Sequence, residues 1–255
     1  MTAFYYGLTV LIWGTTWIAI KNQIGIVPIE ASIAYRFALA GTVLLLVLLM
    51  TRRLHPIALR HHPLIALQAA CLYSCNFICL YMAMFHVPSG VVSVVSSAVA
   101  IFNIMNAFIL GGRRPERRVL TGAVMGVAGI VCLSWDSVTG ATFAYETIKG
   151  VAVALLGAWF FSIGNLVSAR NQEHGLPIAS VNAWAMLYGA AIVSLFAVAR
   201  GVPFTFDPSP VYVASLIHLA MFGSIIAFIA YLTVVGRLGP EKAGYMTVLA
   251  RRWLC

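Results

Sequence analysis

Charge is scarce in this chain of 255 residues, and acidic charge is the scarcest. Charged residues make up 9% of the sequence, with 7 Asp and Glu against 16 Lys and Arg, whereas hydrophobic residues make up 62%. Soluble globular domains are about a quarter charged and about half apolar. The composition therefore excludes a soluble domain and indicates a polytopic membrane protein.

Catalytic and metal-binding patterns are also missing. The sequence has no HExxH, no paired carboxylates and no nucleophile elbow. Its acidic residues fall outside the predicted membrane spans, apart from Glu30 at the start of one. Its five cysteines give no disulfide framework, because four of them lie inside apolar runs. We therefore expect no enzyme activity, no metal and no organic cofactor.

What the sequence does have is many apolar runs, each about as long as the roughly 20 residues that cross a bilayer as a helix. We predict an all-α polytopic membrane helix bundle with eight full spans and a fragment of a ninth from Ala243 onward. The first run has no basic segment before it and no cleavage site after it, so we expect a retained helix. The predicted spans are Phe4–Ile20, Ile29–Met50, Pro63–Phe85, Gly90–Leu110, Val119–Trp135, Gly150–Ala169, Ile178–Ala199 and Val211–Gly236.

The basic residues predict which way the chain crosses the membrane. With the N-terminus in the cytoplasm, the inside loops hold ten Lys and Arg residues and the outside loops hold three. Cytoplasmic loops of membrane proteins carry such an excess, so we expect a cytoplasmic N-terminus. The same placement explains the net charge of +9 without a nucleic-acid partner.

Two stretches of the chain echo each other. The segment "PIEASIAY" opens the second span, and "PIASVNAW" opens the seventh, 149 residues later. The prolines of "HVPSG" and "LGPEK" are 152 residues apart, and Trp13 and Trp159 are 146 apart. These offsets relate spans that are five apart along the chain. Because five is an odd number of membrane crossings, the second half has the opposite orientation in the membrane to the first. Inverted repeats of this kind are a signature of secondary transporters.

The predicted second half is shorter than the first. After Pro88 the first half continues for 47 residues, whereas 15 residues follow Pro240, a difference of 32. We interpret residues 1–137 as a first five-helix repeat and residues 148–255 as a second, incomplete one. On this interpretation the chain is truncated before its ninth span is complete.

Arg36 is the outstanding candidate for a functional residue. It lies seven residues into the second span, about 10 Å from the helix end at 1.5 Å per residue. A charge at that depth costs at least about 2.5 kcal/mol unless it is paired or faces a wet cavity. One interpretation is an anchor for an anionic or carboxylate-bearing substrate. The other is a structural arginine that binds loop carbonyls or extends toward the headgroups.

Other polar and aromatic residues inside the spans are candidates for the wall of a substrate cavity. Each also has a structural interpretation: interhelical hydrogen bonds for the asparagines, interfacial anchoring for the aromatic residues, and either a proton relay or a structural hydrogen bond for the histidine. With Arg36, the predicted cavity residues are Trp13, Tyr35, Asn76, Asn103, Trp159, Asn165, Trp184 and His218.

Taken together, these features resemble the EamA-type carriers of the drug/metabolite transporter superfamily. The resemblance covers nearly the whole chain and rests on "LIWGTTWIAIK", "AYRFALAG", "MFHVPSGVVSVVSSAVAIFNIMNAFILGGRRP", "TGAVMGVAGIVCL" and "VVGRLGPEKAGYMTVL". It implies ten helices in two inverted five-helix repeats, a central cavity and alternating access. The chain departs from the family pattern at Ala100, where proline is frequent, at Gly112, where glutamate is frequent, and at its end.

We therefore predict a secondary transporter of the bacterial inner membrane that exports small metabolites or amino acids by alternating access. Its partners would be a small-molecule substrate and the lipid bilayer, and homodimerisation is left open. The alternatives are a truncated membrane protein that does not transport, and an integral membrane enzyme or accessory subunit. Proton exchange and simple facilitation are both compatible with the sequence.

Overall fold

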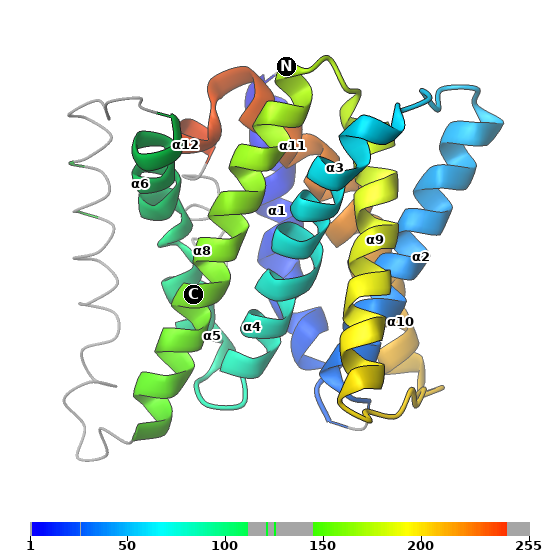
Figure 1. Cartoon of the computed structure of the whole chain (residues 1–255). Helices are drawn as coiled ribbons and strands as arrows, with labels where there is room; N and C mark the ends of the chain where they lie inside the picture. Colours follow the sequence, from blue (N-terminus) through cyan, green and yellow to red (C-terminus); the bar gives the residue numbers. More distant parts are fainter. Residues whose placement is uncertain (1, 26, 112–120, 122–124, 126–144, 244–255) are drawn as a thin grey trace.

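The computed structural model describes residues 2–25, 27–111, 121, 125 and 145–243, and all regular structure within these ranges is helical (Figure 1). The predicted fifth span, apart from Thr121 and Met125, and the predicted ninth span after Ala243 lie outside the described residues. The described elements are α1 (Thr2–Lys21), α2 (Ile29–Met50), η1 (Leu59–His61), α3 (His62–Ala69), η2 (Ala70–Cys75), α4 (Asn76–Ala83), α5 (Ser89–Ser96), α6 (Val99–Gly111), α8 (Tyr145–Glu173), α9 (Ile178–Ala199), α10 (Pro210–His218), η3 (Leu219–Ile226), α11 (Ala227–Leu238) and α12 (Pro240–Ala243).

Six helical segments in the described part of the chain are long and apolar enough to cross a membrane. These are Ile29–Met50, Leu59–Ala83, Ser89–Ile109, Tyr145–Glu173, Ile178–Ala199 and Pro210–Leu238. Helix α1 adds a further 20 residues. The prediction of a helical membrane bundle is confirmed, and the predicted bounds of the second and seventh spans coincide with α2 and α9.

Proline and glycine set several of the helix ends. Pro28 and Pro177 hold extended conformations directly before α2 and α9, so each helix begins at the next residue. Ser209 caps α10 by accepting a hydrogen bond from the Tyr212 amide. Gly239 ends α11 with φ at 86°, a conformation that glycine adopts without steric cost.

Two membrane-length helices contain a π-helical segment. The segment η2 (Ala70–Cys75) joins α3 to α4, and η3 (Leu219–Ile226) joins α10 to α11. Their first residues are 149 residues apart, the same offset that separates the first residues of α2 and α9. Single π turns inside α-helices are rare and frequently occur at functional sites, so the two segments indicate a functional site near them.

A break in the fourth predicted span divides it into α5 and α6. It falls at Ser97 and Ala98, shortly before Ala100. The hydroxyls of Ser96 and Ser97 donate to the carbonyls of Val92 and Val94 in their own helix. Such local side-chain bonds compete with regular helical bonding, and the break therefore forms without a proline at position 100.

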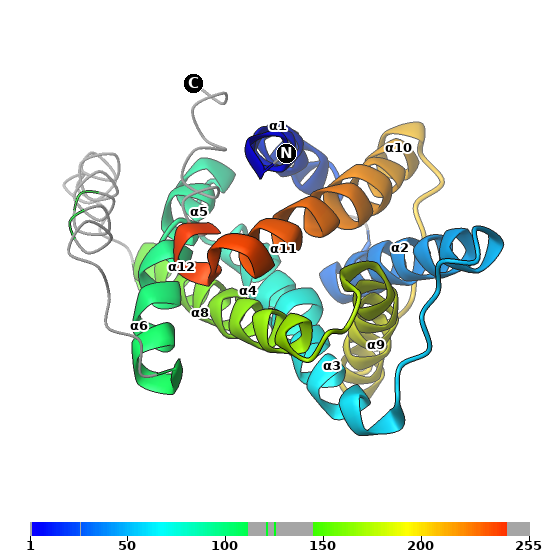
Figure 2. The ribbon, with the colours of Figure 1, turned by 90° about the horizontal axis from the view of Figure 1, so that it is seen from above.

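The helices pack in pairs that join early and late parts of the sequence. Helix α2 lies along α9, α4 packs on α8, and α1 packs on α11. In the view from above, α11 lies between α1 and α8, while α5 and α6 lie on the far side of α8 from α9 (Figure 2). The π segments also pack against helices from the other part of the sequence: η2 packs on α9, and η3 packs on α2.

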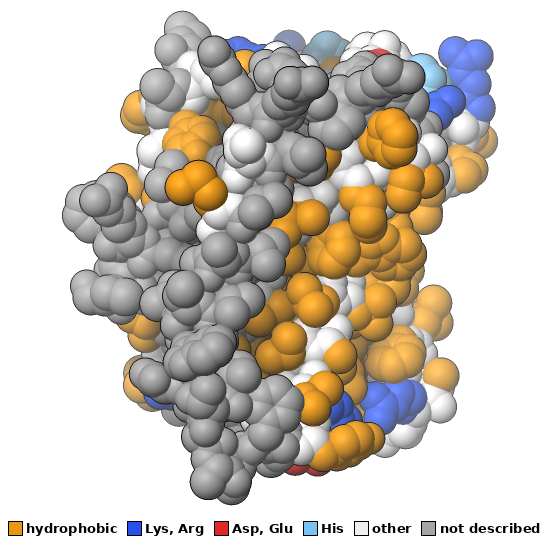
Figure 3. Space-filling view, turned by 90° about the vertical axis from the view of Figure 1, so that its left-hand side faces the viewer, with side chains coloured by type: hydrophobic (Ala, Val, Ile, Leu, Met, Phe, Trp, Pro, Cys, Tyr) orange, Lys and Arg blue, Asp and Glu red, His pale blue; other side chains and the backbone are white. Residues whose placement is uncertain are grey.

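Hydrophobic side chains gather in the middle of one face of the molecule. Figure 3 shows such side chains in a broad band on one face, with Lys, Arg, His and acidic side chains gathered toward the two ends. Leu46, Leu195 and Val198 are among the exposed hydrophobic residues. A bilayer solvates this kind of surface, whereas water would not.

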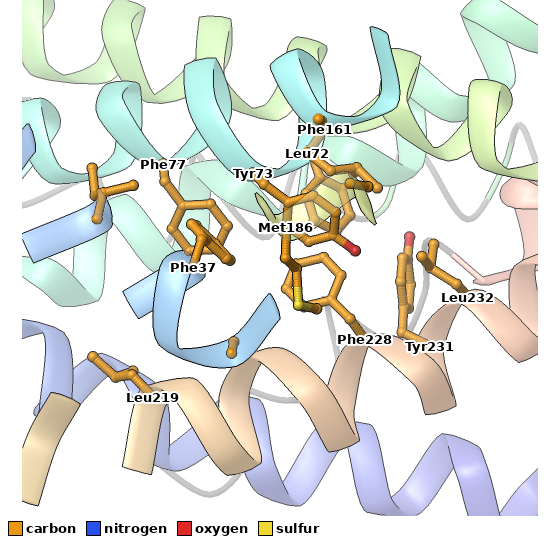
Figure 4. Close-up of a cluster of buried hydrophobic side chains, with 14 of the residues drawn as sticks. Phe37, Leu72, Tyr73, Phe77, Phe161, Met186, Leu219, Phe228, Tyr231 and Leu232 are labelled. Carbon is orange, nitrogen blue, oxygen red and sulfur yellow. The ribbon is translucent and has the colours of Figure 1, made fainter. Parts of the chain in front are cut away.

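The core of the bundle is aromatic. Phe37 of α2, Tyr73 of η2, Phe161 of α8 and Phe228 of α11 are buried and lie in one cluster (Figure 4). The ring centroids of Phe37 and Tyr73 are 5.1 Å apart, and those of Tyr73 and Phe228 are 5.0 Å apart, in tilted geometries. Aromatic pairs at such distances add about 0.5–1.5 kcal/mol each beyond the area they bury.

The α9–η2 contact depends on a glycine. A Cβ at Gly189 would lie 2.6 Å from the Cβ of Tyr73. We expect Gly189→Ala to lower the free energy of unfolding by about 1–3 kcal/mol through overpacking. Reversible unfolding in mixed micelles, followed by circular dichroism, measures the change. Gly7→Ala is the matched control, because no atom lies within 4 Å of a Cβ there. Equal stability of the two variants would contradict the close packing.

Candidate functional site

A cavity at the centre of the bundle is the candidate functional site. It offers about 90 Å³ to the centres of water molecules, and one water needs about 10–15 Å³ by that measure. Its wall is formed by α1, α2, α4, α5, α6, α8 and α11, so it joins segments from both ends of the described sequence. The lining residues are Trp13, Thr16, Trp17, Ile20, Arg36, Asn76, Phe77, Leu80, Ser93, Ser96, Val99, Ala158, Phe161 and Phe228.

Arg36 carries the only charge among these lining residues. Its side chain is buried, with 2% of its surface exposed. Its Nε donates a hydrogen bond to Ser224 Oγ of η3 at 2.8 Å. Its Cζ lies 4.6 Å from the ring centroid of Phe77 and 5.2 Å from that of Phe37. Two cation–π contacts, the hydrogen bond to Ser224 and an interaction with the Tyr81 hydroxyl therefore surround the guanidinium.

Within the described part of the chain, no ion pair includes Arg36. The pairs His86–Glu146 and Arg200–Glu30 involve other residues. The Nη1 atom of Arg36 is buried without a hydrogen-bond partner. A buried charge that lacks compensation lowers the stability of the folded protein. The centre of the bundle thus holds a positive charge with an unused donor.

Trp13 and Asn76 complete the polar part of the wall. The indole Nε1 of Trp13 donates to the Gly223 carbonyl of η3 at 3.4 Å. Asn76 follows η2 directly and is 2% exposed, and its side chain forms no hydrogen bond with the described residues. Its amide group is therefore available to a solute in the cavity. Both π segments supply or position groups at this site.

Aromatic rings close one side of the cavity. The ring centroid of Trp13 lies 5.9 Å from that of Phe161, 5.4 Å from that of Phe228 and 4.9 Å from that of Tyr231. These rings come from α1, α8 and α11, as Figure 4 shows for Phe161, Phe228 and Tyr231. The rings separate the cavity from the polar cluster that lies beyond them.

That polar cluster ties four elements together. Asn165 Nδ2 of α8 donates to Tyr231 Oη of α11 at 2.7 Å and to Asn103 Oδ1 of α6 at 3.3 Å. Asn103 Nδ2 donates to the carbonyl of Pro240, the first residue of α12, at 2.8 Å. Such bonds between helices in hydrocarbon contribute about 0.6 kcal/mol each on average.

Of the nine residues predicted to line a cavity, the structure brings Trp13, Arg36 and Asn76 to its wall. Six lie elsewhere. Asn103 and Asn165 belong to the polar cluster, and the remaining four are near the helix ends or the outer surface. Tyr35 donates to the Thr205 carbonyl, Trp184 lies 5.7 Å from the His62 ring, Trp159 lies 5.4 Å from the Phe160 ring, and His218 contacts Thr15 Oγ1 at 3.1 Å.

Several residues of the cavity wall are not among the residues predicted from the sequence. Thr16, Trp17 and Ile20 follow Trp13 at three-, four- and seven-residue spacing, which places them on one helix face. That spacing could have predicted these three residues from the sequence. No sequence pattern predicts Phe161 and Phe228, because an aromatic residue inside an apolar span can face lipid, the protein core or a cavity.

The chain is similar in sequence to several bacterial membrane transporters. The chain is 27% identical over 241 residues to the uncharacterized inner membrane transporter YedA of Escherichia coli (strain K12), covering 91% of this chain and 74% of that protein. It is 24% identical over 172 residues to a probable amino-acid metabolite efflux pump of the same strain, covering 65% of this chain and 56% of that protein. It is 23% identical over 240 residues to the uncharacterized transporter YoaV of Bacillus subtilis (strain 168), covering 91% and 79%.

A solved crystal structure shares the fold. Its TM-score with this chain is 0.74 at 21% sequence identity, and the match covers 99% of this chain and 86% of that one. The helices define a polytopic helical membrane bundle. Residues 1–135 match the model of the EamA-like transporter family. The chain belongs to this family and is a membrane transporter.

The hydrogen bond between Arg36 and Ser224 gives a test of the site's geometry. Ser224→Ala removes the acceptor of a buried charged donor, so we expect the free energy of unfolding to fall by about 1.5–3 kcal/mol. Unfolding in mixed micelles followed by tryptophan fluorescence measures it. Ser97→Ala is the control, because Ser97 is also buried but bonds only to its own helix. A loss no larger than in the control would contradict the geometry.

Proposed function

We propose that this protein is a secondary transporter of the bacterial inner membrane that exports small metabolites by alternating access. The observation that carries the proposal is a cavity among membrane-length helices whose wall holds the buried Arg36, with its Nη1 atom lacking a hydrogen-bond partner. An ionisable side chain held inside the membrane faces a substrate or ion pathway by default. A purely structural bundle gains nothing from such a group.

Correspondence between the two halves supports alternating access. Helices α2 and α9 have 22 residues each and are offset by 149 at both ends. The π segments share this offset at their starts. The pairing of α4 with α8 corresponds to that of α11 with α1 under the same relation. We interpret the chain as two inverted repeats, which in carriers rock against each other around a fixed site.

The two sides of the cavity differ, as one state of such a cycle requires. The wall residues Ile20, Leu80 and Ser93 lie toward the ends of their helices at Lys21, Ala83 and Ser89. On the opposite side, the aromatic rings and the Asn103–Asn165–Tyr231 cluster fill the bundle. The state described here is therefore the outward-facing one if the N-terminus is cytoplasmic.

Charge and relatives support the orientation and the direction. Arg52, Arg53, Arg60, Arg170 and Arg237 lie at the end of the bundle that carries the N-terminus, and an excess of arginine marks the cytoplasmic side. One relative is named as a probable amino-acid metabolite efflux pump. Export of small metabolites is accordingly our proposal for this chain, with a small-molecule substrate and the lipid bilayer as its partners.

Flux across proteoliposomes tests the function. Loaded vesicles containing the protein should release radiolabelled amino acids or organic acids from a substrate panel faster than protein-free vesicles. Ser96→Trp places a bulky ring in the cavity wall, so we expect release to fall at least about tenfold. Ala152→Trp is the control, because Ala152 is exposed on the surface of α8. Unchanged release by folded Ser96→Trp protein would contradict transport through this cavity.

Topology has a separate test. In a cysteine-free background, Arg60→Cys should react only with reagents from the cytoplasmic side and Thr205→Cys only from outside, because the two positions lie at opposite ends of the bundle. Accessibility labelling in intact cells with a membrane-impermeant maleimide measures this. Labelling of Arg60→Cys from outside would invert the proposed orientation.

A further inference from the structure

We propose that the cavity binds amphipathic monocarboxylates, molecules with one carboxylate on an aromatic or aliphatic body and no balancing positive charge. This inference rests on the proposed transport function and names the substrate class of the same site. It follows from three properties of the wall: the sign of its charge, the polarity of its unused groups and the shape of its apolar surface.

The charge of the wall selects an anion. Arg36 is the only ionisable residue among the lining side chains, and no carboxylate lies with it. A cationic ligand would meet repulsion at close range in a medium of low dielectric constant. A zwitterion would find a partner for its carboxylate and none for its ammonium group. An anion alone matches the charge that the described wall presents.

The unused hydrogen-bonding groups nearest the Arg36 charge are donors. Arg36 Nη1, in the cavity wall, has no partner, and Gln23 Nε2, which does not line the cavity, is likewise buried without one. The Tyr81 hydroxyl lies between them, because it donates to Gln23 Oε1 at 3.0 Å and interacts with the Arg36 guanidinium. Asn76 adds an amide at the cavity wall. A carboxylate offers acceptors only, and a guanidinium fork binds it in two parallel hydrogen bonds.

The rest of the wall selects the body of the ligand. Trp13, Trp17, Phe77, Phe161 and Phe228 present aromatic surface on several sides of the cavity. A small inorganic anion leaves this surface without contact, whereas an aromatic or aliphatic chain buries it. Pockets of this kind use apolar walls for affinity and a few polar groups for orientation. The carboxylate thus lies at Arg36 and the chain extends toward the tryptophans.

Binding measurements on the purified full chain test the inference without relying on transport. The probes are 3-phenylpropionate, its uncharged amide 3-phenylpropionamide and the zwitterion phenylalanine, titrated in carboxylate-free buffer while tryptophan fluorescence is recorded. Trp13 and Trp17 line the cavity and report occupancy. We expect the acid to bind at least about tenfold more tightly than the amide or the zwitterion, since a hydrogen bond to a charged group contributes about that factor. Equal affinity of acid and amide would overturn the proposal.

Variants of Arg36 assign the selectivity to one residue. Arg36→Gln should remove the preference for acid over amide, and Arg36→Lys should keep a reduced preference, because ammonium retains the charge but not the planar fork. Arg237→Gln is the control: its guanidinium lies over Tyr5, away from the cavity wall, and the preference should be unchanged. Acid selectivity that survives Arg36→Gln would refute the assignment. If Arg36→Gln does not fold, the acid-to-amide ratio of the unaltered protein decides.

Failure of binding and failure of transport remain distinguishable. Selective binding of the acid without any flux from proteoliposomes would count against the transporter function and leave the carboxylate site standing. Flux of other solutes without acid-selective binding would count against the carboxylate site and leave the transporter function standing. Replacing sulfate by chloride in the buffer at equal ionic strength should not displace bound 3-phenylpropionate. Full displacement would show that the cavity binds inorganic anions and would overturn the proposal.

Discussion

A guanidinium in the hydrocarbon region must find acceptors or a counter-charge within the protein, because lipid supplies neither. Arg36 meets this constraint incompletely. Ser224 accepts one hydrogen bond, and the rings of Phe37 and Phe77 supply cation–π contacts. The Nη1 atom remains unpaired. A buried charge with an unpartnered donor beside a cavity is the feature on which our proposal of an anionic ligand rests.

The π segments are the structural means by which the bundle reaches this arrangement. Segment η3 brings Ser224 to Arg36 and the Gly223 carbonyl to the Trp13 indole. A Cβ at Gly223 would lie 2.9 Å from Thr16 Cγ2 and 3.2 Å from Arg36 Nη2, so glycine is required for this approach. Segment η2 contacts α9 at Gly189 and leads directly into Asn76. Irregular backbone at membrane depth is tolerated where protein surrounds it or it lines a cavity.

The sequence allowed much of the helical layout to be predicted. The apolar runs after Pro28 and Pro177 located α2 and α9 to the residue, because proline limits where a helix can begin. The depth of Arg36 singled it out as a candidate without any structure. The π segments were not predictable, because one extra residue per turn leaves no mark in a uniformly apolar run. The sequence predicts Tyr35 and Trp184 at the cavity, whereas the structure places them away from its wall. An aromatic residue near the start of a span does not reveal which neighbouring helix its side chain faces.

The most direct test of these relations is a structure of the full chain determined with 3-phenylpropionate bound. We predict density for the ligand inside the cavity, with its carboxylate within hydrogen-bonding distance of the Arg36 guanidinium and its ring against Trp13 or Phe77. Density for the ligand elsewhere, with Arg36 contacting only protein atoms, would contradict the central claim that this buried charge is the binding site of a carboxylate.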